Sequence, residues 1–200
     1  MQPSRATRPE YLAAFSELIQ RIAESLRKLP TRSLPIKMYV AGGAAVHFYS
    51  GERISNDVDA VFSKRIALPS DLEVAYRDPD GAARLLYFDR QYNDTFALMH
   101  KDAHDDSVPL TLKEIDASIL EVRLLSALDL AVSKISRFSG QDRDDITALA
   151  KHDLIKSAAL RRRSLEAMKN YVGNLDSLKS TIDVACRIVG DVEQRNSGKR

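Results

Sequence analysis

Apolar residues recur along the chain at two different spacings, and each spacing predicts a different kind of element. Between residues 8 and 29 they follow the three- and four-residue spacing of an amphipathic helix. Further on they form short runs, which predict buried strands at 36–42, 56–63 and 119–125. The N-terminal half is therefore expected to build a small sheet beside a long helix.

Turn-forming residues divide the region between these strands. The sequence DLEVAYRDPDGAARLLYFD (71–89) places two runs of strand formers around a D-P-D-G turn, which predicts a β-hairpin. Residues 95–100 fit either a short strand or a helical turn. The acidic stretch 101–117 is typical of a loop.

Helical signals dominate the C-terminal part of the chain. A capping-box-like start at Ser126 predicts a helix over 126–138, which Gly140 is expected to end. Asp142 is expected to cap the next helix, which runs to about Lys151. The remaining predictions are two longer helices and a frayed tail, at 156–172, 175–189 and 191–200.

These elements together predict an α+β protein with a small mixed β-sheet, flanking helices and a helical C-terminal part. We expect two domains, with the sheet in residues 1–125 and helices in 126–200. No apolar run approaches the roughly 20 residues of a membrane helix, so no membrane association is expected. The single cysteine, Cys186, and the absence of an apolar signal core behind the N-terminus predict a cytoplasmic protein.

Charge is unevenly distributed along the 200 residues. Residues 51–121 contain 8 basic and 15 acidic side chains, whereas residues 151–200 contain 11 basic and 6 acidic ones. This favours either a cation bound in the middle and a polyanion at the end, or simply a solvated acidic loop and a basic tail. Similarly, the run Arg161–Arg163 fits RNA binding or a solvated helix face, and the histidines near position 100 fit a solvated loop better than a metal site.

The stretch GGAAVHFYSGERISNDVDAVF (42–62) carries the clearest sign of chemistry. Gly42 and Gly43 head a short helix, where backbone N–H groups can approach a phosphate; a tight turn is the simpler alternative. Asp57 and Asp59 would share one face of a buried strand, or lie at an exposed strand edge. Two adjacent carboxylates are costly unless a cation neutralises them, and Mg²⁺, which accompanies nucleotide phosphates, is the natural candidate.

This pattern, two glycines followed by R-x-S-x-D-x-D at 53–59, resembles the nucleotidyltransferases of the DNA-polymerase-β fold. The closest similarity is to the abortive-infection toxin type (AbiEii-like). A second stretch, LLSALDLAVSKISRFSGQDRDDITALA (124–150), supports the resemblance with a lysine, an arginine and a D-x-x-D start to the following helix. The resemblance covers about residues 36–150.

The resemblance implies Mg²⁺-dependent transfer of a nucleoside monophosphate from a nucleoside triphosphate to a tRNA or protein acceptor. It also implies a toxin with an antitoxin protein as partner. Asp57 and Asp59 would hold the metal as catalytic residues, and Asp145 would position the acceptor. The residues expected to bind the nucleotide are Gly42, Gly43, Arg53, Ser55, Lys134 and Arg137.

Several of these residues also have simpler interpretations. Arg53 and Ser55 fit loop contacts or support of the aspartates equally well. Lys134 is also explained as a solvated helix lysine, and Asp142 as a helix cap. The stretch 124–150, with its lysine and D-x-x-D start, therefore supports the fold more strongly than it supports the activity.

The sequence departs from the family pattern at two points. Position 43 is glycine where many relatives have serine, so that hydroxyl is absent. The third carboxylate of the metal site is not evident: Asp89 and Glu121 are the candidates, and we favour Glu121 because its strand can lie beside the first one. Two other functions stay open, a catalytically degenerate fold that binds a nucleotide or partner, and a basic nucleic-acid-binding module.

Overall fold

The structure is a computed structural model that describes residues 7–95 and 97–198, and it divides the chain into two compact units. The first unit runs up to Asn93 and includes Ser107–Leu124; it carries every strand of the described residues. The second consists of Asp94–Asp106 and the chain from Leu125 onward. The boundary after Leu124 lies one residue from the expected one, and the segment Asp94–Asp106 joins the helical unit.

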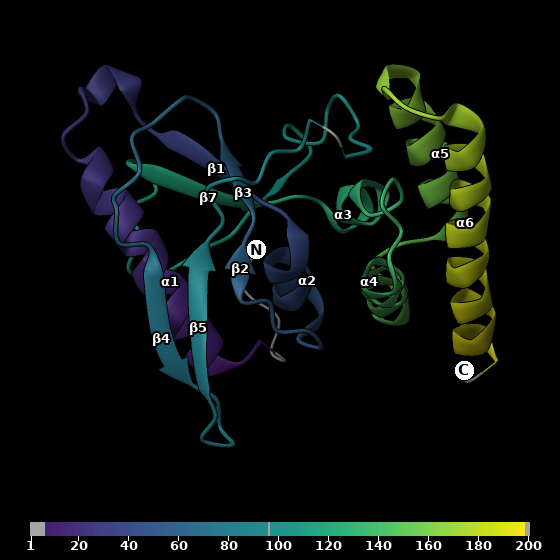
Figure 1. Cartoon of the computed structure of the whole chain (residues 1–200), viewed down its shortest axis with the longest axis horizontal. Coiled ribbons are helices and arrows are strands. Elements are labelled where there is room, and N and C mark those ends of the chain that lie inside the picture. The colour runs from purple at the N-terminus through teal and green to yellow at the C-terminus, as the bar shows by residue number, and fades with distance from the viewer. Residues whose placement is uncertain (1–6, 96, 199–200) are drawn as a thin grey trace. The chain divides into compact units, whose positions relative to one another are not determined.

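The strands of the first unit form two small mixed sheets, which confirms the predicted α+β class (Figure 1). One sheet has the order β3-β1-β7-β6, with β1 antiparallel to β3 and parallel to β7. The other has the order β2-β5-β4, with β5 parallel to β2 and antiparallel to β4. The strand bounds are β1 Ile36–Val40, β2 Asp57–Val58, β3 Ala60–Phe62, β4 Glu73–Arg77, β5 Ala83–Phe88, β6 Val108–Pro109 and β7 Leu120–Leu124.

The prediction of one continuous strand over 56–63 is wrong, because the chain changes sheets at Asp59. The backbone carbonyl of Asp59 accepts a hydrogen bond from the Ala41 N–H at 2.8 Å, and the following residues pair with β1. The preceding residues pair with β5 instead. The two aspartates of the motif therefore lie at the junction of the two sheets.

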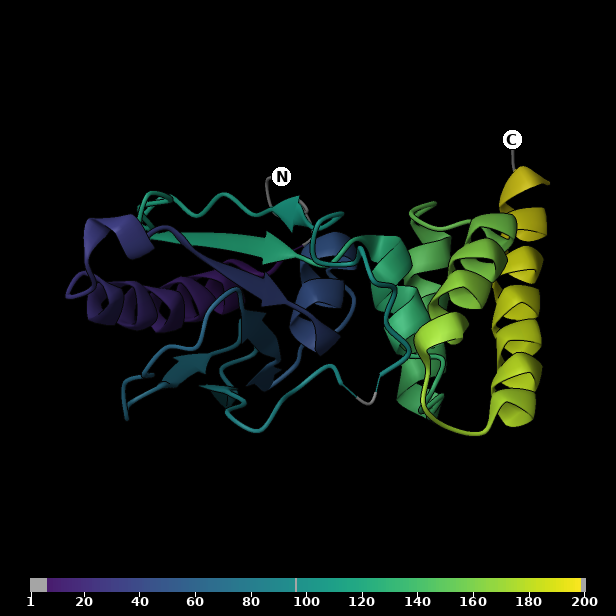
Figure 2. The same cartoon turned by 90° about the horizontal axis from the view of Figure 1, so that it is seen from above.

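Helix α1 (Pro9–Leu26) supplies much of the core of the first unit. Its apolar face is fully buried at Tyr11, Phe15 and Leu18, as the periodicity predicts. Figure 2 shows α1 alongside β1 and β7, with β4 and β5 on its other side. The short helices of this unit are η1 (Thr31–Ser33) and α2 (Gly42–Ser50), and Gly51 ends α2 with a φ of 72°.

The hairpin predicted over 71–89 is confirmed, with β4 and β5 joined by a turn in which Gly81 has a φ of 82°. No strand or helix forms in the described part of 95–100; residue 96 of that segment lies outside the described residues. The expected loop 101–117 contains the two-residue strand β6, which pairs with β7.

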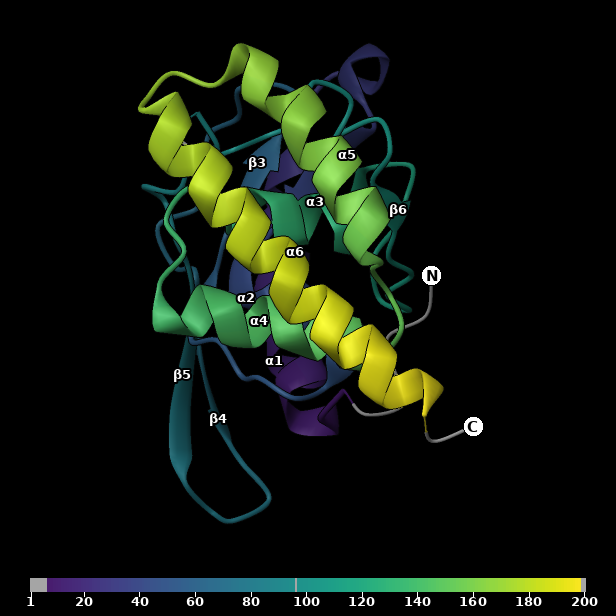
Figure 3. The same cartoon turned by 90° about the vertical axis from the view of Figure 1, so that its right-hand side faces the viewer.

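The second unit is built from helices, in which α6 packs against both α4 and α5 (Figure 3). No helix in the described part of the chain is long and apolar enough to span a membrane. The bounds are α3 Ala127–Ser133, α4 Gly140–Lys151, α5 Ser157–Ala167, η2 Met168–Asn170 and α6 Leu175–Ser197.

Three predicted helix ends differ from the structure. Helix α3 ends at Ser133, five residues early, because the backbone hydrogen bonds of Lys134 and Ile135 go to the carbonyls three residues before them, and Phe138, with a φ of 48°, then leads into the next helix. Gly140 does not end a helix but begins α4, whose N-cap is Ser139 rather than Asp142. The tail expected to fray is helical to Ser197, since buried side chains such as Val192 continue the packed face of α6.

Candidate active site

The start of α2 lies against the second aspartate of the motif. Gly42 has a φ of 59°, a region that favours glycine. A methyl group added to Gly42 would lie 1.9 Å from Asp59 Oδ2, so this position has room for no side chain. The glycine thus lets the carboxylate of Asp59 lie directly against the first residue of the helix.

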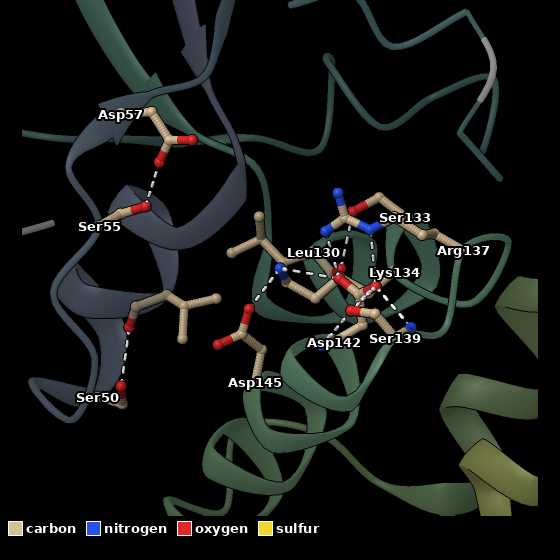
Figure 4. Close-up of polar contacts among 11 residues, drawn as sticks. Ser50, Ser55, Asp57, Leu130, Ser133, Lys134, Arg137, Ser139, Asp142 and Asp145 are labelled. Carbon is tan, nitrogen blue, oxygen red and sulfur yellow. Dashed lines mark hydrogen bonds and ion pairs between the residues drawn. The ribbon is translucent and has the colours of Figure 1, made fainter. Parts of the chain in front are cut away.

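The second glycine makes room for two side chains of the R-x-S-x-D-x-D motif. A methyl group at Gly43 would lie 2.6 Å from Ser55 Oγ and 2.9 Å from Arg53 Cζ. The hydroxyl of Ser55 therefore lies directly beside Gly43. Ser55 is buried, and it donates a hydrogen bond to Asp57 Oδ1 (Figure 4). This contact favours the interpretation of Ser55 as a support for the first aspartate.

Strand β5 brings Asp89 next to the aspartate pair. In the parallel pairing of β2 with β5, Asp57 lies opposite Tyr87 and Val58 opposite Phe88. The pairing continues as the Asp89 N–H donates to the Val58 carbonyl at 3.1 Å, which sets Asp89 beside Asp59. The carboxylates of Asp57, Asp89 and Asp59 all raise the pKa of Tyr87, with Asp57 the main cause.

Glu121, the favoured third carboxylate, lies elsewhere in the first sheet. It is on β7 opposite Lys37 of β1, whereas Asp59 adjoins the other end of β1. Its side chain accepts a hydrogen bond from Arg123 in an ion pair. Within residues 7–95 and 97–198, no group of three or more His, Cys, Asp or Glu side chains is gathered closely enough to hold a metal ion.

Lys134, Asp142 and Asp145 of the second motif form a network inside the second unit (Figure 4). Lys134 Nζ lies 2.6 Å from Asp145 Oδ2 and 3.9 Å from Asp142 Oδ1. The side chains of Lys134 and Asp145 are only 5% and 2% exposed. The interpretation of Lys134 as a solvated lysine is therefore wrong.

Asp142 stabilises the start of α4. With Ser139 it forms a reciprocal capping box, and Arg137 donates to both of its carboxylate oxygens at 2.7 and 2.8 Å. Burial opposes ionisation of Asp142, but these hydrogen bonds from Arg137 and Ser139 outweigh it and lower its pKa to about 2. Capping of α4, one of the interpretations that the sequence allows, is thus sufficient to explain Asp142. The carboxylate of Asp142 also binds the side chain of Arg137.

The other polar clusters of the sequence have structural partners. Arg163 is only 14% exposed and pairs with Asp129 and Asp106, while Arg161 pairs with Asp183. The three arginines therefore do not form one solvated face. His100 Nε2 lies 3.4 Å from Glu166 Oε2, in the same unit.

Sequence reasoning missed two tyrosines near the aspartates, Tyr11 and Tyr87, whereas it expected His47 to be packed or near the cleft. Tyr11 is fully buried on α1, and burial, then the charges of Tyr76 and Asp57, raise its pKa. His47 is fully buried against Tyr11, with ring centroids 4.6 Å apart, and its Nε2 accepts from the Arg8 N–H. Tyr87 lies beside Asp57 only through strand pairing, which no local sequence signal reveals.

A glycine-headed helix lies against one of two paired aspartates on a small mixed sheet, as the resemblance to nucleotidyltransferases implies. The comparison with protein families agrees with this class. The sequence model of the family described as "Nucleotidyltransferase of unknown function (DUF6036)" matches residues 17–186, so the chain belongs to this family. No curated protein matches the chain, and no solved structure matches it either.

Proposed function

We propose that this protein transfers a nucleoside monophosphate from a nucleoside triphosphate to a hydroxyl of an RNA or protein acceptor, in a reaction that requires Mg²⁺. The observation that carries the proposal is the close approach of Asp59 to Gly42, with Asp57 held by Ser55 next to it. Because of this approach, the backbone N–H groups that would bind phosphate, at the start of α2, adjoin the carboxylates that would bind the metal, Asp57 and Asp59.

The chemistry of Asp57 and Asp59 fits a magnesium site with two carboxylate ligands. Carboxylate oxygens are the ligands that Mg²⁺ prefers, and the space beside Gly42 is kept for the Asp59 carboxylate by the absence of a Cβ. Asp57 and Asp59 would hold the ion as a pair, and Asp89, which follows the strand paired with β2, lies on the neighbouring strand of the same sheet, whereas Glu121 lies in the other sheet. When bound, Mg²⁺ would neutralise the charge that develops on the reacting phosphate.

The protein's own groups would orient the donor. The first backbone N–H groups of α2 have no partners within the helix, so they can donate to the leaving phosphates. Ser55 would keep the Asp57 carboxylate in one orientation. Contacts of Lys134 and Arg137 with the triphosphate, and of Asp145 with the acceptor, stay predictions from the sequence resemblance, as do the toxin role and the antitoxin partner.

Melting curves with Mg²⁺ and each nucleoside triphosphate test the proposal. We expect the wild-type protein to melt at a higher temperature with both ligands together than with either one, since binding to the folded state stabilises it. Asp57→Asn should remove this shift without lowering the melting temperature of the ligand-free protein, because it relieves repulsion with Asp59. Asp105→Asn, at an exposed aspartate of the second unit, is the matched control.

A second candidate is a catalytically degenerate member that binds a nucleotide or a partner protein. It is favoured by the absence, in the described part of the chain, of three metal-binding side chains gathered together. Transfer of label from α-³²P nucleoside triphosphates to any macromolecule separates the two candidates. Mg²⁺-dependent binding without transfer to RNA or protein would support the degenerate form.

A further inference from the structure

One face of the β2-β5-β4 sheet is open to solvent and carries apolar side chains next to the aspartates. Residues alternate along its strands, and Val74, Leu86 and Phe88 point to the buried side. The opposite side of β4 and β5 is exposed along its whole length. We call this side the open face; its residues on these two strands are Glu73, Ala75, Arg77, Ala83, Leu85 and Tyr87.

Two large side chains on this face are unexpected for a solvated surface, where a sheet with one buried side usually carries polar residues. Leu85 is 44% exposed and Tyr87 is 39% exposed. They are two residues apart on β5, and Tyr87 lies opposite Asp57 across the strand pair. An apolar strip therefore leads along β5 up to the proposed metal site.

The arrangement around β2 assigns a role to this strip, if the proposed nucleotidyl transfer is correct. Strand β5 adjoins one edge of β2, and α2 lies on the other side of β2 (Figure 1). In a displacement at phosphorus, the attacking oxygen and the leaving oxygen lie roughly in line on opposite sides. With the leaving pyrophosphate at the start of α2, the acceptor hydroxyl approaches from the side of β5.

Charge indicates what kind of acceptor fits. The metal would neutralise the aspartates that adjoin the strip, which leaves Glu73, opposite Tyr87 on β4, as the acidic residue of the open face. The basic residue of the open face, Arg77, is at the far end, where it donates to the Gly81 carbonyl. Single-stranded nucleic acids are bound in positively charged grooves, so the face suits an uncharged or basic polypeptide better than RNA.

We propose that the open face binds the acceptor, and that this acceptor is a polypeptide whose hydroxyl side chain is presented to the nucleotide across Tyr87 and Leu85. The hydroxyl oxygen of the polypeptide forms a bond to the α-phosphorus of the nucleoside triphosphate. The bond from that phosphorus to pyrophosphate breaks, and the hydroxyl proton passes to water. Tyr87 and Leu85 are acceptor-binding residues in this reaction, which rests on the proposed function.

The test compares donor binding with transfer in the same variants. Tyr87→Ala and Leu85→Lys should keep Mg²⁺-dependent binding of the nucleoside triphosphate within about twofold of wild type. Transfer of ³²P label to the proteins of a bacterial extract should fall about tenfold, the loss expected for removing one buried side-chain contact. Controls in the second unit are Tyr171→Ala, at a half-buried tyrosine, and Leu165→Lys, at a leucine that is 39% exposed; both should label as wild type does.

The outcomes separate this inference from the proposed function. Loss of donor binding in Tyr87→Ala, or undiminished protein labelling in both variants, would overturn the inference while leaving nucleotidyl transfer intact. Labelling confined to total RNA, and increased by the added lysine of Leu85→Lys, would identify RNA as the acceptor instead. A wild-type protein that neither binds the donor nor transfers label would refute the proposed function, and the inference with it.

Discussion

Replacing Lys134 by methionine should destabilise the protein strongly. The ammonium lies 2.6 Å from Asp145 Oδ2, and both side chains are almost fully buried. Lys134→Met keeps most of the side-chain volume but leaves the Asp145 carboxylate buried without its cation. Breaking a buried ion pair in this way costs about 3–5 kcal/mol of the free energy of unfolding. Urea unfolding at pH 7, followed by circular dichroism, measures this loss.

The double variant Lys134→Met/Asp145→Leu provides the internal comparison. Replacing both charges by apolar groups of similar size removes the unfavourable buried charge, so its stability should return to within about 1–2 kcal/mol of wild type. Lys156→Met is the control, because Lys156 is 53% exposed and its pairs with Asp153 and Glu193 are solvated. Such exposed pairs contribute no more than about 1 kcal/mol.

A loss of less than about 1 kcal/mol in Lys134→Met would refute the buried pair. The same variants test the sequence-based expectation that Lys134 contacts the triphosphate. That contact requires the ammonium to leave Asp145 or to be shared with it. If the stable double variant binds Mg²⁺ and nucleoside triphosphate as wild type does, the expected nucleotide-binding role of Lys134 is wrong.

Two further predictions concern backbone geometry and pH. Gly42→Ala should abolish Mg²⁺-dependent nucleotide binding and lower the melting temperature, because a methyl group would lie 1.9 Å from Asp59 Oδ2 at a φ of 59°; an unchanged melting curve would contradict this geometry. Asp142→Asn should cost about 2 kcal/mol at pH 7, since the pKa of Asp142 is lowered from 3.8 to about 2 and its ionised form stabilises the folded state. This difference from wild type should disappear as the pH falls from about 4 to 2, and a difference that persists at pH 2 would exclude ionisation as its cause.

The local pattern of the sequence was sufficient for most elements of the first unit. The helical periodicity of α1 and the D-P-D-G turn of the hairpin depend on residues close together in the chain, and both predictions are confirmed. The family resemblance is also a local property, since it rests on the glycine pair and the motif that ends at Asp59. The family comparison confirms the class of nucleotidyltransferases.

Helix ends in the second unit were predicted less well, because competing caps decide them. Ser139 and Asp142 satisfy each other's backbone N–H groups, and this stabilises a start of α4 at Gly140. A glycine in that position is read from sequence as a helix end, although the same residue is tolerated at a helix start. The choice depends on which hydrogen bonds form in the folded chain.

Only the tertiary structure decided which residues surround the aspartates. The chain switches sheets at Asp59, and β5 then pairs with β2, which brings Asp89 and Tyr87 to the motif from some thirty residues away. Glu121 is on an equally plausible strand, but strand register places it near the start of β1 and beside Arg123. Register follows from the hydrophobic pattern of whole strands and from the turns that join them, so residues within the motif carry no signal for it.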